Sequence, residues 1–174
     1  PLYAQYHFGI EALRIDGRVI ERRDRDFEAT AMGSLFNKID PGKRPATIVE
    51  AKSVRDIIAT LKYAKARGKK VTVCSGGHSW SANHLREDSI MIMMKHFNSY
   101  EINAQAMTAT AGPGVGGSHL LSELYKQKLF FPAGHCKGVC IGGYLLQGGY
   151  GWNGRKTGIA CESVIGIDMV TADG

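Results

Sequence analysis

Residues 69–80 read Lys-Lys-Val-Thr-Val-Cys-Ser-Gly-Gly-His-Ser-Trp, and this stretch decides the fold prediction. The β-branched run 71–73 predicts a short, mostly buried strand. Two adjacent glycines, Gly76 and Gly77, end the strand, because they let the backbone turn through positive φ and approach other groups closely. Successive N–H groups in such a turn can form an anion-binding nest, with His78 at its edge. A turn that only redirects the chain, with His78 bonded to a carbonyl, explains these residues equally well.

The residues before this stretch predict a βαβ unit. Residues 46–51 read as a strand, and Ser53 is a helix N-cap with Asp56 as its capping-box partner. Apolar residues at 54, 57, 58, 61 and 64 keep helical spacing, and Gly68 suits the position after the helix. Because the strands of a βαβ unit are parallel, the loop at 75–79 is expected at a carboxyl strand end. Open α/β sheets bind ligands at that edge.

A second, glycine-rich stretch of the sequence strengthens the prediction made from the first. Residues 131–151 read Phe-Pro-Ala-Gly-His-Cys-Lys-Gly-Val-Cys-Ile-Gly-Gly-Tyr-Leu-Leu-Gln-Gly-Gly-Tyr-Gly. Together the two stretches resemble the flavin-binding half of the vanillyl-alcohol oxidase/p-cresol methylhydroxylase superfamily, most closely its berberine-bridge-enzyme-like branch. The matching residues are Ser75 to Ser79, Pro132 to Cys136, Gly142-Gly143 and Gly148 to Gly151, and the resemblance runs from about Pro45 to Gly174.

The resemblance implies an α+β fold of the two-subdomain PCMH-type FAD-binding kind. It would have a small parallel sheet, a larger mixed sheet and flanking helices, and would be incomplete at its C-terminus. Residues 1–44 are expected to form an N-terminal extension packed on the domain. Residues 45–174 would be the N-terminal major part of the FAD-binding domain, after a turn at 41–45.

The resemblance also implies FAD bound covalently through two residues, His78 and Cys136. A neutral imidazole and a thiolate suit this role, since both are nucleophiles that could add to an electrophilic flavin tautomer. A buried, unreactive thiol is the alternative for Cys136. The full set of expected cofactor contacts is Cys74, Ser75, Gly76, Gly77, His78, Ser79, Gly134, His135, Cys136, Gly142, Gly143, Gly148, Gly149, Gly151, Ile167 and Val170.

Three residues depart from the pattern of the branch. Tyr144 stands where the branch usually has histidine, Gln147 replaces the first of three glycines, and Cys140 takes a position that is usually glycine. In the resembled family that turn lies near the flavin, where residue size affects the access of oxygen. Oxidase and dehydrogenase activity therefore both remain open.

The expected function is FAD-dependent oxidation, in which a small organic substrate such as an alcohol, sugar or natural product transfers a hydride to flavin N5. Oxygen would reoxidise the flavin, and this chain would supply the covalent flavin-binding part. Catalytic residues are expected outside this chain. A second polypeptide, or a cleaved C-terminal fragment, is expected to complete the fold. The rival interpretation is a non-catalytic binding or scaffold module.

Residues 112–117 offer a second enzyme class, because they match the G-x-G-x-x-G pattern of nicotinamide-dependent dehydrogenases. Two observations disfavour it. Pro113 removes a backbone donor where a pyrophosphate would need one. No acidic residue ends a strand about 20 residues later to hold a ribose.

Composition and charge exclude several other classes. The 174 residues are 44% hydrophobic, enough for one globular core, and the net charge of +6 is spread rather than gathered. Neither nucleic acid nor a membrane is expected as a partner. The four cysteines have no usual zinc spacing, so no metal site is expected. No signal-peptide pattern is visible, which leaves both a cytoplasmic and a secreted, processed protein possible.

The remaining elements are predicted from local patterns. Asp16-Gly17 predicts a hairpin turn between 13–15 and 18–20. Strands are expected at 88–95 and 107–111, with a short pairing strand after the turn at 98–101. The last expected elements are a helix at 118–128 and an apolar strand at 164–171.

Overall fold

A four-stranded mixed sheet forms the first part of the computed structural model, which describes residues 13–174. In spatial order the strands are β1 (Arg18–Glu21), β2 (Thr47–Glu50), β4 (Ile90–Met93) and β3 (Val71–Cys74). Strand β1 is antiparallel to β2, whereas β2, β4 and β3 are mutually parallel. The strands predicted at 46–51, 70–74 and 88–95 are confirmed, and β4 lies between the two strands of the βαβ unit.

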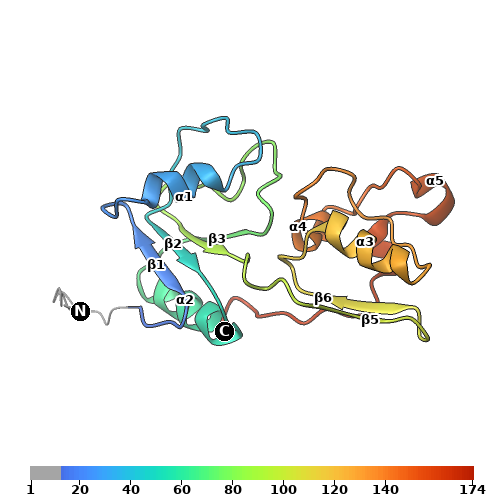
Figure 1. Ribbon diagram of the computed structural model, residues 1–174. Helices are drawn as coiled ribbons and strands as arrows, with labels where there is room; N and C mark the ends of the chain where they lie inside the picture. The colour runs from blue at the N-terminus through green and yellow to red at the C-terminus, as the bar shows by residue number, and fades with distance from the viewer. Residues whose placement is uncertain (1–12) are drawn as a thin grey trace.

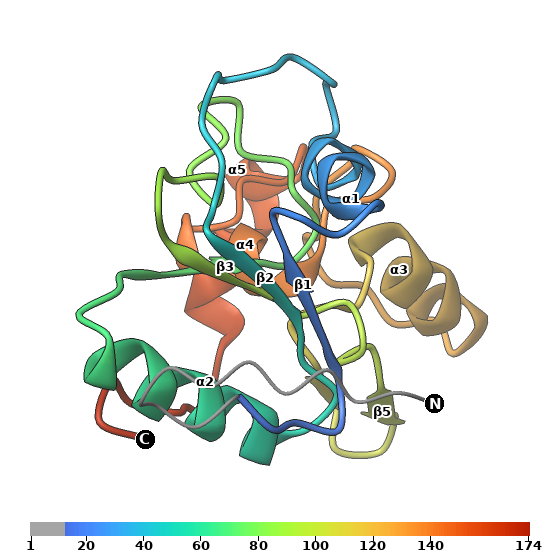
Figure 2. The same ribbon diagram turned by 90° about the vertical axis from the view of Figure 1, so that its left-hand side faces the viewer.

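Two helices cover opposite faces of this sheet, α1 (Phe27–Gly33) and α2 (Val54–Ala66), as Figure 2 shows. Side chains alternate between the faces along each strand. Ile48 of β2 accordingly packs in the cluster that contains Phe27 of α1, whereas its neighbour Val49 packs in the cluster that contains Ala64 of α2. Because both faces are covered, the central parallel strand β4, Ile-Met-Ile-Met, is apolar on both sides rather than alternating.

The second part of the chain is built on an antiparallel ribbon of β5 (Tyr100–Asn103) and β6 (Thr108–Ala111). It lies beside the first part (Figure 1). The predicted pairing of these strands and the predicted helix after them are confirmed. Helix α3 (Gly117–Lys126) and helix α4 (Ile141–Leu146) pack on the ribbon around a buried cluster. Short helices α5 (Gly154–Thr157) and η1 (Ala160–Ser163) follow.

The start of α2 shows why the predicted hairpin at Asp16-Gly17 is wrong. Ser53 caps the helix as predicted, since its hydroxyl accepts from the Asp56 N–H. The Asp56 carboxylate, however, accepts from the N–H groups of Lys52, Asp16 and Gly17 at 2.8 to 3.0 Å, and no capping box forms. This buried carboxylate anchors residues 16–17, and β1 then pairs with β2 rather than with 13–15.

Replacing Asp56 with alanine should destabilise the fold by about 3 kcal/mol at neutral pH, because three backbone donors lose their acceptor. Burial raises the pKa of Asp56, but the hydrogen bonds outweigh burial and lower the pKa below its usual value. A lowered folded-state pKa stabilises the fold above the unfolded-state pKa of about 4. The difference between wild type and Asp56→Ala should therefore shrink as the pH falls below about 4 in urea titrations. A difference that is constant down to pH 2 would contradict this assignment, and Asp168→Ala is the exposed control.

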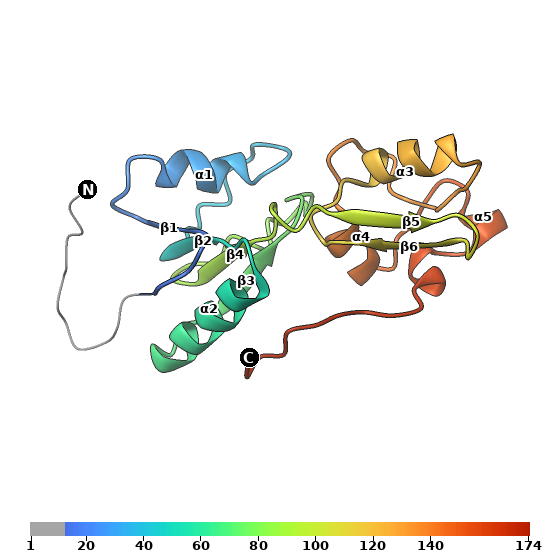
Figure 3. The same cartoon turned by 60° about the horizontal axis from the view of Figure 1, so that its bottom comes forward.

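The strand predicted at 164–171 is wrong. The segment leaves η1 without secondary structure and runs back to α2, where Gly174 lies close to Ile58 (Figure 3). No strand within residues 13–174 pairs with it, and Ile165, Ile167 and Met169 are 88%, 74% and 76% exposed. An apolar β-branched sequence becomes a strand only where another strand supplies its hydrogen bonds and packing.

The α+β class is confirmed, but the predicted division into two sheets is not. The expected parallel sheet is mixed, because β1 from the region before residue 45 joins it in antiparallel orientation. The expected larger mixed sheet is, within the described residues, a ribbon of two strands. Across residues 13–174, no helix combines the length and apolar character needed to cross a membrane.

Candidate functional site

The turn at 75–79 follows β3 at the carboxyl edge of the parallel strands, as predicted. Gly77 adopts φ +66°, in the left-handed region that favours glycine. A Cβ on Gly77 would lie 1.7 Å from the carbonyl oxygen of Ser34, so the backbone of the 34–36 segment packs directly on the turn. The Phe36 N–H donates to the Gly77 carbonyl at 3.3 Å. Only glycine fits this position.

The amides of this turn are the feature that suits an anion. The backbone N–H groups of Ser75, Gly76, His78 and Ser79 donate to no acceptor among residues 13–174. The Gly77 amide interacts with the Cys74 sulfur. Nearly all backbone donors in folded proteins have a partner, so four neighbouring unpaired amides are available to solvent or a ligand. Around a left-handed glycine they have the composition of a phosphate-binding nest.

His78 lies half-buried against an aromatic side chain that the sequence motifs do not include. Its ring stacks on Phe36 with centroids 4.7 Å apart and an interplanar angle of 13°, and Trp80 meets the same phenyl ring edge-on at 5.0 Å. Burial lowers the pKa of His78 below its usual value, which favours the neutral, nucleophilic imidazole. No sequence pattern pointed to Phe36, because it lies far from both glycine motifs along the chain.

The structure brings the two glycine motifs together. A Cβ on Gly76 would lie 2.6 Å from the Gly138 carbonyl oxygen and 3.0 Å from the Cys140 sulfur, so these backbones are in close contact. A Cβ on Gly138 would come within 2.9 Å of His78 Nε2, and one on Gly142 within 2.9 Å of Ser75 Oγ. The turn after β3 therefore faces the turn before α4.

Cys136 lies in that facing turn, two residues before Gly138, and its side chain is exposed. Its carbonyl accepts from the Val139 N–H at 3.3 Å. The neighbouring His135 is also exposed and stacks on Trp152 at 4.7 Å, so it faces away from the fold's core. Because the Cys136 side chain is exposed, the alternative of a buried thiol is excluded.

Two glycines of the second motif, Gly134 and Gly149, pack around Tyr144. The Tyr144 hydroxyl donates to the Pro132 carbonyl at 2.6 Å, and its ring lies against Gly134 and Gly149. Burial raises the pKa of this phenol. Tyr144 thus ties α4 to the 132–134 segment. Gly151 packs on Pro132, Gly148 lies against the ring of Tyr150, and at Gly143 a Cβ would meet no atom within 4 Å.

The glycine-rich loop at 112–117 is occupied by the protein itself. The N–H groups of Gly112, Gly114 and Gly117 donate to the carbonyls of Ser99, Phe97 and Val139 at 2.8 to 2.9 Å. Donors used in this way cannot hold a pyrophosphate. The structure therefore supports the rejection of a nicotinamide site here, in addition to the absence of an N–H on Pro113.

Other expected contact residues lie elsewhere. The Cys74 side chain is buried in the core, and burial raises the pKa of its thiol to about 11. Ile167 and Val170 lie on the 164–171 segment, and no backbone hydrogen bond joins them to the 75–79 turn. His84 is buried beside Ser34, with its Nε2 3.0 Å from the Ser34 hydroxyl. No three His, Cys, Asp or Glu side chains of residues 13–174 are arranged to hold a metal ion.

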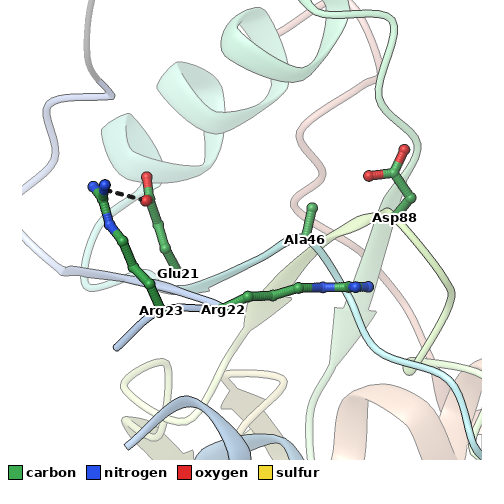
Figure 4. A pocket seen from close by; sticks show the side chains of 5 residues that line it. All are labelled: Glu21, Arg22, Arg23, Ala46 and Asp88. Atoms are coloured by element: carbon green, nitrogen blue, oxygen red, sulfur yellow. Dashed lines mark ion pairs between the residues drawn. The ribbon is translucent and has the colours of Figure 1, made fainter. Parts of the chain in front are cut away.

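A shallow pocket on the sheet lies away from this site. It is lined by Glu21, Arg22, Arg23, Ala46 and Asp88 (Figure 4). Ala46 and Asp88 precede β2 and β4, so the pocket is at the amino edge of the parallel strands, opposite the 75–79 turn. The Arg22 guanidinium donates to the Pro45 carbonyl and pairs with Glu87. The pocket is therefore not part of the candidate site.

Residues 45–174 match the family described as FAD binding domain. The chain belongs to this FAD-binding family. Both facing turns lie inside the matched range, whereas Phe36 and β1 lie before it. The unpaired amides around Gly77, at the carboxyl edge of β3, fit the pyrophosphate of FAD. Domain limits at 44 and 45 remain a prediction, because β1 and α1 share the sheet and its core.

Named proteins carry the same domain. FAD-linked oxidoreductase nodO of Hypoxylon pulicicidum is 40% identical over 149 residues, which cover 86% of this chain and 33% of that protein. (R)-6-hydroxynicotine oxidase of Paenarthrobacter nicotinovorans is 31% identical over 165 residues, which cover 93% of this chain and 35% of that protein. The FAD-binding chain therefore spans about a third of the length of the curated relatives it matches.

Solved structures show the same fold. The crystal structure of 6-hydroxy-D-nicotine oxidase from Arthrobacter nicotinovorans has a TM-score of 0.84 and 29% identity, over 93% of this chain and 35% of that one. A variant of BBE-like 1 from Physcomitrella patens has a TM-score of 0.82 and 25% identity, over 91% of this chain and 34% of that one. The predicted resemblance to berberine-bridge-enzyme-like flavoproteins is confirmed.

Proposed function

We propose that this chain supplies the FAD-binding part of an FAD-dependent oxidoreductase. The observation that carries the proposal is the set of four unpaired amides around Gly77, within a chain that belongs to an FAD-binding family. These amides would hold the pyrophosphate, and the close backbone contact between Gly76 and the Gly138 turn would form the adjoining wall.

His78 and Cys136 would anchor the cofactor covalently. The neutral His78 ring lies against Gly138, two residues after the exposed Cys136, so both nucleophiles border one turn. On attachment, each residue would lose its N–H or S–H proton and bond to a flavin carbon that loses a hydrogen, the 8α-methyl carbon for His78 and ring carbon 6 for Cys136. The two electrons released each time would pass to oxygen, which would be reduced to hydrogen peroxide. Two attachment points would keep an open site loaded.

FAD, when bound, would supply the redox chemistry, as N5 accepts a hydride and oxygen removes it. The substrate would be a small organic molecule such as an alcohol, sugar or natural product. The names of similar proteins support this range, since they include a hydroxynicotine oxidase and a xylooligosaccharide oxidase. Two residues of the second motif depart from the pattern of the branch. The Tyr144 hydroxyl donates to the Pro132 carbonyl, and the Cys140 thiol donates to the Gly114 carbonyl.

Further polypeptide would complete the site, either as a second chain or as a C-terminal fragment. The 164–171 segment supports this proposal. From Ile165 to Val170 its N–H groups make no hydrogen bond with residues 13–174, and its side chains Ile165, Ile167 and Met169 are exposed. An apolar segment with unpaired backbone is a template for another strand. Substrate-orienting groups would come from the same added polypeptide.

The experiment purifies residues 1–174, incubates them with FAD and measures visible absorbance after acid precipitation, solution mass and turnover. Flavin that stays with the precipitate, together with no turnover, is the expected result. A protein that retains no flavin even before acid treatment would favour the non-catalytic module. A soluble monomer that oxidises substrate unaided would contradict the need for further polypeptide. Reduction of an added nicotinamide cofactor instead of FAD would support a nicotinamide-binding site at residues 112–117.

A further inference from the structure

The Phe36 side chain makes a set of contacts that neither the family match nor the glycine motifs account for. Its phenyl ring lies nearly parallel to the His78 imidazole, with centroids 4.7 Å apart, and its N–H donates to the Gly77 carbonyl at 3.3 Å. Trp80 packs against the same phenyl ring in an edge-to-face arrangement, with centroids 5.0 Å apart. One residue therefore contacts the turn on both sides of the Gly77–His78 peptide bond.

No hydrogen bond fixes the ring of His78: neither imidazole nitrogen has a hydrogen-bond partner among residues 13–174. A Cβ on Gly138 would lie 2.9 Å from His78 Nε2, so the backbone of Gly138 lies at the ring edge. A histidine without a hydrogen-bond partner can rotate about its side-chain bonds unless packing holds it. Phe36 and Gly138 pack against the ring, and of these two Phe36 offers the flat surface.

We propose that Phe36 is a positioning residue that holds the His78 imidazole in the orientation from which it bonds to FAD. The inference rests on the proposed role of His78. A flat aromatic face restricts the ring to a parallel plane without taking either nitrogen into a hydrogen bond, so a nitrogen stays free as a nucleophile. The hydrogen bond from the Phe36 N–H to the Gly77 carbonyl also joins the backbone of the 34–36 segment to the turn that carries His78. Phe36 lies nine residues before the matched range begins, since that range starts at residue 45.

The test compares the full chain with Phe36→Leu, Phe36→Tyr and Phe97→Leu, each in the Cys136→Ala background so that flavin can attach only through His78. Leucine keeps an apolar side chain but removes the flat ring, and tyrosine restores it. Phe97 is a matched control, because it is also half-buried but packs in a different cluster, on the α2 face of the sheet. Thermal unfolding checks that all four proteins fold.

Two readouts are taken. The first is the proton NMR chemical shift of the His78 ring in the absence of FAD. The stacked phenyl ring should move this signal upfield, and its loss in His78→Ala assigns it. The second is the rate at which the tryptic peptide containing His78 gains the mass of FAD. Phe36→Leu should lose the displacement and slow attachment about tenfold, as expected when a nucleophile is no longer held in place. Phe36→Tyr should restore both, and Phe97→Leu should change neither.

The outcomes separate this inference from the proposed function. Attachment through His78 at the wild-type rate in a folded Phe36→Leu protein would overturn the positioning role and leave the proposed function standing. A His78 signal that does not move in Phe36→Leu would also overturn it, since the stack would not exist in solution. No flavin on the His78 peptide of the parent protein would overturn the covalent role of His78 and, with it, the inference.

Discussion

Replacing Gly77 with valine is expected to abolish FAD binding and to destabilise the fold more than any other single change in the site. The residue has φ +66°, which costs a non-glycine residue about 1–2 kcal/mol. A Cβ would also lie 1.7 Å from the Ser34 carbonyl oxygen, far inside any contact distance. The 34–36 segment would have to leave the turn, and the hydrogen bond from Phe36 to the Gly77 carbonyl would break.

Gly42→Val is the matched control for this prediction. Gly42 has a nearly identical φ of +65°, but a Cβ there would meet no atom within 4 Å. The Gly42→Val protein should therefore lose about 1–2 kcal/mol of stability through backbone strain alone, without a steric clash, and should bind FAD normally. Urea unfolding gives the stability, and retained visible absorbance after desalting gives the binding. Full flavin occupancy in Gly77→Val would contradict the assignment of the turn.

Substitution of both proposed anchors, His78→Ala with Cys136→Ala, is expected to remove all acid-stable flavin. His78→Ala alone should leave flavin on the peptide that contains Cys136, and Cys136→Ala alone should leave it on the peptide that contains His78. Neither change should unfold the protein, because Cys136 is exposed and the His78 ring makes no hydrogen bond within residues 13–174. Mass spectrometry of tryptic peptides measures each attachment separately.

Cys161→Ala is the control for thiol loss, since Cys161 is a half-buried free cysteine in η1. Its flavin content should equal that of the wild type. If wild-type peptides containing Cys136 carry no flavin mass, the second attachment is wrong and a single link through His78 remains. Flavin that dissociates completely in acid from the wild-type protein would contradict both links while leaving non-covalent binding by the amides intact.

The errors in the sequence-based prediction have a common physical origin. Local patterns predicted β3, the Ser53 cap and the β5–β6 ribbon correctly, because neighbouring residues specify them. Asp16-Gly17 reads as a hairpin locally, but its N–H groups bind the distant Asp56 carboxylate. The 164–171 run has strand composition, yet a strand also needs a partner, and none is present among the described residues.

The sequence by itself determined the βαβ unit, the position of the 75–79 turn at a carboxyl strand end and, through two glycine motifs, the FAD-binding family. These follow from hydrophobic periodicity, turn chemistry and residue spacing, which act over a few neighbouring positions. Only the tertiary structure decided that Gly76 and His78 face Gly138, that the 112–117 amides are occupied, and that Phe36 stacks on His78. The reason is that these contacts join residues far apart along the chain, and no local pattern encodes which distant partner a backbone or side-chain group meets once the chain has packed.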